Sequence, residues 1–206
     1  MKSVNVTNSS VPGDLPARLM KEFFLEVTTP ATMIYNNIVK STMHNGIDEI
    51  WPRQWKMEYG TPLKKVSQPV DENDLRVISL TNHLSKTFER FVMIWILSYI
   101  GHMMDTNQFG GSKGCSVSHY LIEFINFVLF NQDLSEPHAV LAAMVDFSKA
   151  FNRVNHNLVI TILSRLGIPC WLLKIIASFL IGRELIVRFK GVCSNKQNLP
   201  GGGPQG

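Results

Sequence analysis

The feature that most constrains this sequence is a continuous apolar run at residues 139–147 (AVLAAMVDF), which carries Asp146 next to its end. Uninterrupted apolar runs of this length are typical of strands that are buried on both faces of a sheet. Residues 149–166 follow with apolar side chains at helical spacing, until Gly167 and Pro169 end the pattern. The pattern predicts a buried strand that ends in an acid and turns directly into a helix.

Asp146 has two interpretations on this local pattern. A carboxylate at the end of a rigid strand suits a divalent cation, because hard cations prefer oxygen ligands. The same carboxylate suits the N-cap of the following helix, because it accepts hydrogen bonds from free backbone N–H groups. The residues alone favour the cap. Phe151, at the start of that helix, is by itself most simply a core residue.

The other periodic patterns predict a mixture of helices and strands, and therefore an α+β fold. Residues 185–190 alternate between apolar and basic side chains, which predicts a strand with one basic face that turns at Gly191 into a hairpin. Further elements are predicted as a helix over 86–100 capped by Ser85, a helix over 116–130 and a strand over 75–79.

Charge is distributed unevenly along the chain. Residues 1–146 carry 12 Lys and Arg against 15 Asp and Glu, whereas residues 147–206 carry eight basic side chains and one acidic one. Such a segment is typical of a surface that faces a polyanion. A solvated basic face without a partner explains the charge equally well.

Composition excludes several classes of protein. With 45% hydrophobic and 17% charged residues, the chain is neither a disordered tail nor a disulfide-stapled mini-protein. No stretch reaches the ~18 apolar residues that cross a bilayer, so no membrane partner is expected. The three cysteines lack metal-ligand spacing and suggest reduced thiols. We therefore expect an intracellular protein, nuclear or cytoplasmic.

Several segments, taken in order, resemble reverse transcriptases in the form carried by non-LTR (LINE-type) retrotransposons. Residues 146–156 (DFSKAFNRVNH) are similar to the first catalytic-aspartate motif of that family. Segments 74–90, 108–116 and 199–206 are similar to its fingers segment, its QFGFRKGxST turn and its GxPQG motif. Shorter matches upstream lie at 13–17 and 55–65, so the resemblance covers about residues 11–206.

The resemblance implies a polymerase right-hand fold with helical fingers and an incomplete palm. Residues 1–13 would be a flexible N-terminal segment, and residues 14–135 would form the fingers region with a helical connection to the palm. Residues 136–206 would form a partial palm, truncated at the Pro-Gln-Gly motif. RNA template, DNA primer and dNTPs would be the partners, and no protein partner is implied.

The resemblance also implies roles for single residues. Asp146, helped by the backbone carbonyl of Phe147, would bind catalytic Mg²⁺, as two ions in the complete enzyme, with Mn²⁺ as a possible substitute. Phe151 would be a steric gate that disfavours a 2′-hydroxyl on the incoming sugar. The incoming nucleotide would also be contacted by Lys64, Lys65, Arg76 and Gln205, and the template or primer by Lys113, Arg188, Lys190 and Gly203.

The sequence departs from the family pattern at Val77, Ser112 and Asn152, where Pro, Arg and Asp are expected. The 206 residues also contain no aromatic-x-Asp-Asp motif, which would supply the other metal-binding carboxylates. We therefore expect a fragment of an RNA-directed DNA polymerase that is inactive alone. The alternatives are a non-catalytic nucleic-acid-binding remnant, a retrotransposon relic, and an RNA-dependent RNA polymerase, against which Phe151 argues.

Overall fold

The computed structural model describes residues 11–112, 114–134, 138–147 and 150–204. The chain divides into two compact units. The first joins residues up to 99 to residues from 149 onward, and the second comprises residues 100–148. None of the described helices is both long enough and apolar enough to cross a membrane.

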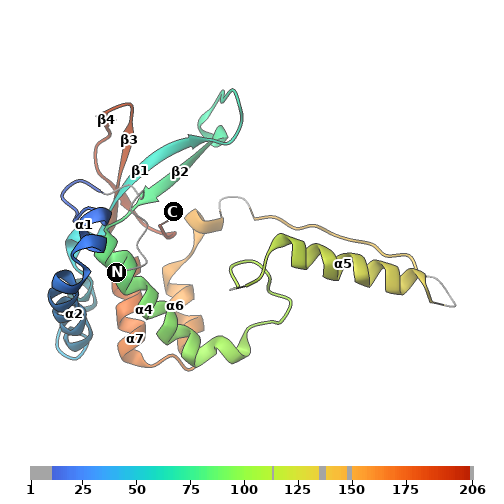
Figure 1. Cartoon of the computed structure of the whole chain (residues 1–206), viewed down its shortest axis with the longest axis horizontal. Helices are drawn as coiled ribbons and strands as arrows, with labels where there is room; N and C mark the ends of the chain where they lie inside the picture. The colour runs from blue at the N-terminus through green and yellow to red at the C-terminus, as the bar shows by residue number, and fades with distance from the viewer. Residues whose placement is uncertain (1–10, 113, 135–137, 148–149, 205–206) are drawn as a thin grey trace. The chain divides into compact units, whose positions relative to one another are not determined.

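The first unit is built on a mixed sheet (Figure 1). Its central strand β1 (Met57–Lys64) pairs antiparallel with β2 (Leu75–Leu80) and parallel with β3 (Arg183–Phe189). The far side of β3 carries two short strands, β4 (Val192–Cys193) and β5 (Gln197–Leu199). The predicted strands at 75–79 and 185–190 and the hairpin at Gly191 are therefore present.

Helices accompany this sheet, so the α+β class is confirmed. The described helices of the first unit are α1 (Ala17–Glu22), α2 (Phe24–Ser41), α3 (Ile47–Ile50), α4 (His83–Ile100, which reaches the unit boundary), α6 (His156–Arg165) and α7 (Cys170–Leu180), with short 3₁₀ turns at η1 (Arg53–Lys56), η2 (Glu72–Asp74) and η4 (Ala150–Arg153).

Aromatic side chains from α2, α4 and α7, together with Trp51 directly after α3, form the core of the first unit. The rings of Tyr35 and Phe88 stack with centroids 5.0 Å apart, and Trp51 meets Phe88 at 5.3 Å and Phe179 at 5.0 Å. The backbone N–H of Trp51 donates to Ser178 Oγ at 2.8 Å, which joins the segment directly after α3 to α7. Burial of such large rings supplies much of the stability of a small core.

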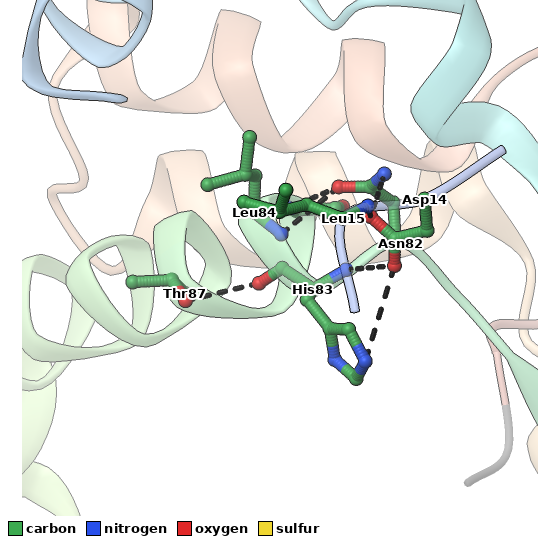
Figure 2. A network of polar contacts seen from close by, with 7 residues as sticks. Asp14, Leu15, Asn82, His83, Leu84 and Thr87 are labelled. Carbon is green, nitrogen blue, oxygen red and sulfur yellow. Dashed lines mark hydrogen bonds and ion pairs between the residues drawn. The ribbon is translucent and has the colours of Figure 1, made fainter. Parts of the chain in front are cut away.

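The start of α4 is capped by side chains from outside the helix (Figure 2). Asn82 Oδ1 accepts from the backbone N–H groups of Leu84 and Ser85. The carboxylate of Asp14 accepts from Asn82 Nδ2 at 2.6 Å and from the His83 N–H at 2.9 Å. The expectation that Ser85 caps this helix is wrong, because the helix begins at His83 and the side chain of Ser85 donates to Glu89 instead.

The helix predicted over 149–166 is interrupted. Among the described residues, η4 ends at Arg153 and α6 begins at His156. The side chain of Asn155 accepts from the Leu158 N–H at 3.1 Å and so caps α6. Asn155, and not Asp146, is therefore the N-cap of α6. Asn is a strong N-cap residue, and here it begins a separate helix inside the region that the sequence predicted as one helix.

Among its described residues, the second unit contains η3 (Gly101–Met103) and one long helix, α5 (Val117–Gln132), which agrees with the helix predicted over 116–130. Residues 138–147 are extended but form no strand, which corrects the prediction of a buried strand over 139–147. Leu141 is 96% exposed and Met144 is 87% exposed. An apolar run becomes a strand only where a neighbouring strand accepts its hydrogen bonds, and no described strand pairs with this one.

Candidate functional site

Asp146 and Phe147 lie at the end of this extended segment. Both side chains are exposed, and Phe147 is 77% exposed. The described residues contain no group of three or more His, Cys, Asp and Glu side chains that could hold a metal ion. Asp146 thus offers one accessible carboxylate, and it does not by itself form a metal centre.

Phe151 lies in η4 of the first unit, directly against the Gly-rich segment that precedes the Pro-Gln-Gly motif. The N–H of Gly203 donates to the carbonyl of Phe151 at 3.1 Å, and the N–H of Gly202 donates to the carbonyl of Val154 at 2.9 Å. The ring of Phe151 remains 62% exposed, so it is not the core residue that its local pattern suggested. Two segments that resemble separate motifs of one family are therefore in direct contact.

Glycine is required at position 202 for this contact. Its backbone φ is +81°, a conformation that residues with a Cβ rarely adopt. A Cβ at this position would lie 2.7 Å from the carbonyl oxygen of Phe151 and 2.9 Å from Cα of Asn152. At Gly203 a Cβ would meet no atom within 4 Å, so this position has space that Gly202 lacks.

The basic residues predicted to bind nucleotide or template divide between the two faces of the sheet. Leu63 pairs with Arg76 across β1 and β2, whereas Lys64 pairs with Leu75. Directly paired residues share a face, and neighbours along a strand alternate. Arg76 and Lys64 therefore point to opposite faces, and the structure does not bring these two predicted triphosphate ligands together.

Arg188 lies on the same face as Arg76. The parallel register pairs Tyr59 with Ile186, and Arg188 follows two residues later on the same face as Ile186. The antiparallel register places Tyr59 on the same face as Leu80. Arg188 is exposed, so one face of the sheet carries exposed guanidinium groups on β2 and on β3.

A pocket of about 280 Å³ opens on this face. Its walls combine cationic, aromatic, hydroxyl and aliphatic groups: Pro12, Tyr59, Thr61, Leu80, Arg188, Lys190 and Gly191. Lys190 is not on the strand as predicted, because β3 ends at Phe189 and Lys190 occupies the turn with a φ of 47°. Its turn position still directs it to the same pocket as Arg188.

Lys65 lies in the loop that joins β1 to β2. Its Nζ donates to the carbonyl of Asn73 at 2.8 Å, and its backbone N–H donates to the carbonyl of Asp74 at 2.8 Å. Hydrogen bonds from the N–H groups of Val70 and Asp71 lower the pKa of Asp74 below its usual range. The loop is thus ordered by its own contacts, and one donor of the Lys65 ammonium is already engaged.

Only some of the basic side chains after position 146 are exposed and available to bind a ligand. Arg183 is buried against Glu58, Lys196 pairs with Glu184 at 3.5 Å, and Lys174 donates to the carbonyl of Thr42. Arg188 and Lys190 remain exposed. Two predicted contacts, Lys113 and Gln205, lie outside the described residues.

Sequence reasoning missed two residues of these surfaces. Tyr59 lines the basic pocket, and its place beside Arg188 depends on the parallel pairing of strands more than 120 residues apart. His156 is the second, and its Nε2 lies 2.6 Å from the carbonyl oxygen of Gly202. No local signal marks either contact.

Comparison with known proteins bears directly on these segments. Residues 63–206 match the model of the family described as reverse transcriptase (RNA-dependent DNA polymerase). This chain belongs to the reverse transcriptase family. The family match includes both η4 and the Gly201–Gly203 segment that it contacts.

A curated relative of this reverse transcriptase chain is the "Probable RNA-directed DNA polymerase from transposon X-element" of Drosophila melanogaster. The two are 31% identical over 179 residues, which is 85% of this chain and 18% of the relative. The chain therefore spans about a fifth of the length of the relative that it matches. The family resemblance of the sequence motifs is confirmed.

Proposed function

We propose that this chain is part of an RNA-directed DNA polymerase of a retrotransposon, which adds dNTPs to a primer under the direction of an RNA template. The observation that carries the proposal is the contact between η4 and the Gly201–Gly203 segment. It joins two family-like motifs into one surface and leaves the ring of Phe151 exposed beside it. In this proposal residues 14–135 belong to the fingers and residues 136–206 to the palm.

Phe151 is proposed to select deoxynucleotides. A large exposed ring excludes a 2′-hydroxyl when its backbone is held rigidly, because a small displacement would relieve the clash. The carbonyl of Phe151 is held by the Gly203 N–H, which supports this role. Arg76 and Gln205 are proposed to contact the incoming nucleotide together with Lys65 rather than Lys64, because strand register places Lys64 on the face opposite Arg76.

Asp146 is proposed to supply one carboxylate ligand to Mg²⁺, with the carbonyl of Phe147 beside it. Reverse transcriptases use divalent metal ions, which would stabilise the charge that develops on the transferred phosphate. What this chain contributes is one accessible carboxylate at the end of an apolar segment. Because the 206 residues contain no Asp-Asp pair, we expect the isolated polypeptide not to extend a primer.

The basic face of the sheet is proposed to bind the template–primer. Arg188 and Lys190 would contact backbone phosphates of the template–primer. Gly203 and Lys113 are proposed to contact the template or the primer as well. Exposed cations around a pocket with an aromatic wall suit a polyanion whose bases can stack. A nucleic-acid-binding role without catalysis rests on the same face and is the second candidate function.

The test is the salt dependence of binding to an RNA–DNA duplex with a single-stranded RNA overhang. Each phosphate contact that is lost should reduce the slope of log K against log salt by about 0.7–0.9. We expect the double variant Arg188→Gln/Lys190→Gln to bind more weakly and with a shallower slope. Arg18→Gln removes an exposed charge that is paired with Glu22 and should leave both unchanged. Undetectable or salt-insensitive binding by the unaltered chain would contradict the interface.

A further inference from the structure

The Gly201–Gly203 segment is held at η4 by one side chain as well as by backbone. His156 Nε2 lies 2.6 Å from the carbonyl oxygen of Gly202. A carbonyl oxygen only accepts, so Nε2 carries the proton and donates. This donor persists whether the ring is neutral with its proton on Nε2 or doubly protonated. The hydrogen bond therefore does not require a particular charge on His156.

The orientation of the imidazole is determined by the helix that carries it. His156 is the first residue of α6, directly after the cap Asn155, whose side chain accepts from the Leu158 N–H. The ring is half-buried, so water competes less for its donor than at a fully exposed position. A capped helix start is a rigid base for a side chain that must reach a loop.

Three hydrogen bonds join the Gly201–Gly203 segment to η4 and to the start of α6. The N–H groups of Gly202 and Gly203 donate to the carbonyls of Val154 and Phe151, and His156 donates to the Gly202 carbonyl. Gly202 is thereby held through both its N–H and its C=O. Displacement of the segment would break the bond that orients the backbone of Phe151.

We propose that His156 is a positioning residue that holds the Gly201–Gly203 segment against the backbone of Phe151 and so determines how strictly the protein selects deoxynucleotides. The proposal rests on the proposed function, because selection by the ring of Phe151 is part of it. His156 does not itself touch the nucleotide in this account. It acts through Gly202, Gly203 and the Phe151 carbonyl.

The positioning step is tested on this chain without any need for catalysis. Amide hydrogen exchange of Gly202 and Gly203 is measured by NMR relative to buried amides of α7, so that a change in global stability cancels. We expect His156→Ala to raise this relative rate at least about fivefold. This factor corresponds to the stabilisation that one ordinary hydrogen bond contributes. His156→Gln, whose amide can donate to the same carbonyl, should stay within about twofold of the unaltered chain.

His119→Ala is the matched control, because His119 contacts Ser116 in the second unit and should not affect Gly202 or Gly203. An unchanged relative rate in His156→Ala would overturn the proposal. So would equal rates for His156→Ala and His156→Gln. Either result would leave the family and the role of Phe151 untouched.

The selectivity step is tested in a chimera, in which this chain replaces the matching region of the Drosophila relative. The ratio of kcat/KM for dNTP and rNTP is compared among the unaltered chimera and its His156→Ala, His156→Gln and Phe151→Ala forms. We expect His156→Ala to lower the ratio several-fold and His156→Gln to preserve it. A ratio lowered by Phe151→Ala but not by His156→Ala would overturn the positioning role of His156 and leave the Phe151 gate intact. A ratio that Phe151→Ala leaves unchanged would overturn the gate, and the exchange rates would then decide the positioning role by themselves.

Discussion

The carboxylate of Glu58 and the guanidinium of Arg183 form an ion pair between neighbouring strands β1 and β3, with both side chains only 1% exposed. Arg183 Nη1 also donates to the carbonyl of Phe179, and the guanidinium lies 4.7 Å from the centroid of the Phe179 ring. The pair thus joins the sheet to the end of α7. It lies on the sheet face opposite Tyr59 and the basic pocket, so it supports that surface from beneath.

Removal of one partner should be costly, because the other charge would remain buried and uncompensated. We expect Glu58→Ala to lower the free energy of unfolding by about 3–5 kcal/mol, measured by urea denaturation. The matched control is Glu22→Ala, which breaks the exposed pair with Arg18. It should change little, because exposed pairs are screened by solvent. Equal effects of the two substitutions would contradict a structural role for the buried pair.

The stability of the first unit should depend on the protonation of Glu89. Burial raises the pKa of Glu89 above its usual value of 4.5, against the hydrogen bond from Ser85 and the charge of Arg183, which lower it. The folded state therefore binds the proton more tightly than the unfolded state does. This contribution to stability is complete below the unfolded pKa and is lost as pH rises through the folded pKa.

We therefore expect Glu89→Gln to gain stability relative to the unaltered chain as pH rises from 4 to 8. The difference between the two unfolding free energies is measured across that range, so that other titrating groups cancel. A difference that stays constant with pH would contradict the raised pKa of Glu89.

Asp14 should matter far more than an exposed aspartate. Its side chain is 1% exposed and accepts from Asn82, the His83 N–H and the Leu15 N–H (Figure 2). We expect Asp14→Ala to cost about 2 kcal/mol, because donors at the start of α4 would be left unsatisfied. Asp14→Asn retains one acceptor and should cost less. Exposed Asp133 supplies the control, Asp133→Ala, and thermal unfolding of the three variants gives the ranking.

Much of the α+β fold follows from periodicity in the sequence. The strands β2 and β3 alternate with a period of two, and α5 is an apolar segment that is too long for a strand, so local sequence is sufficient for all three. The segment 139–147 shows where this reasoning fails, because a strand also needs a partner, and pairing is not a local property. Asn155 shows a second reason, since a single cap residue divided a region that looked like one helix.

The sequence identified several single residues of the candidate site, but it did not predict how they are arranged relative to one another. The motif positions identified Phe151 and Gly203, and the structure joins them through one hydrogen bond. Arg76 was expected to act with Lys64 or Lys65, and strand register puts Lys64 on the opposite face. The sequence did not identify His156 and Tyr59 as residues of the site, because the place of each depends on a contact between segments that are distant in the chain.

Gly202 and Gly203 offer a matched pair of substitutions. Gly202→Ala forces a Cβ against the Phe151 carbonyl and requires a left-handed backbone, which costs at least roughly 1 kcal/mol. We expect it to accelerate amide exchange throughout 201–203. Gly203→Ala has open space and should leave exchange nearly unchanged while it weakens binding to the RNA–DNA duplex, if nucleic acid approaches Gly203 closely. Rapid exchange in both variants would contradict the close packing assigned to Gly202 alone.

The polymerase function is tested by RNA-templated extension of a DNA primer by the chimera with the Drosophila relative, in the presence of Mg²⁺ and dNTPs. We expect the chimera to extend the primer and Asp146→Ala to abolish extension, while Asp133→Ala in the same unit leaves it intact. Extension that survives Asp146→Ala would contradict the assignment of Asp146 as a metal ligand and, with it, the proposed polymerase function of this chain.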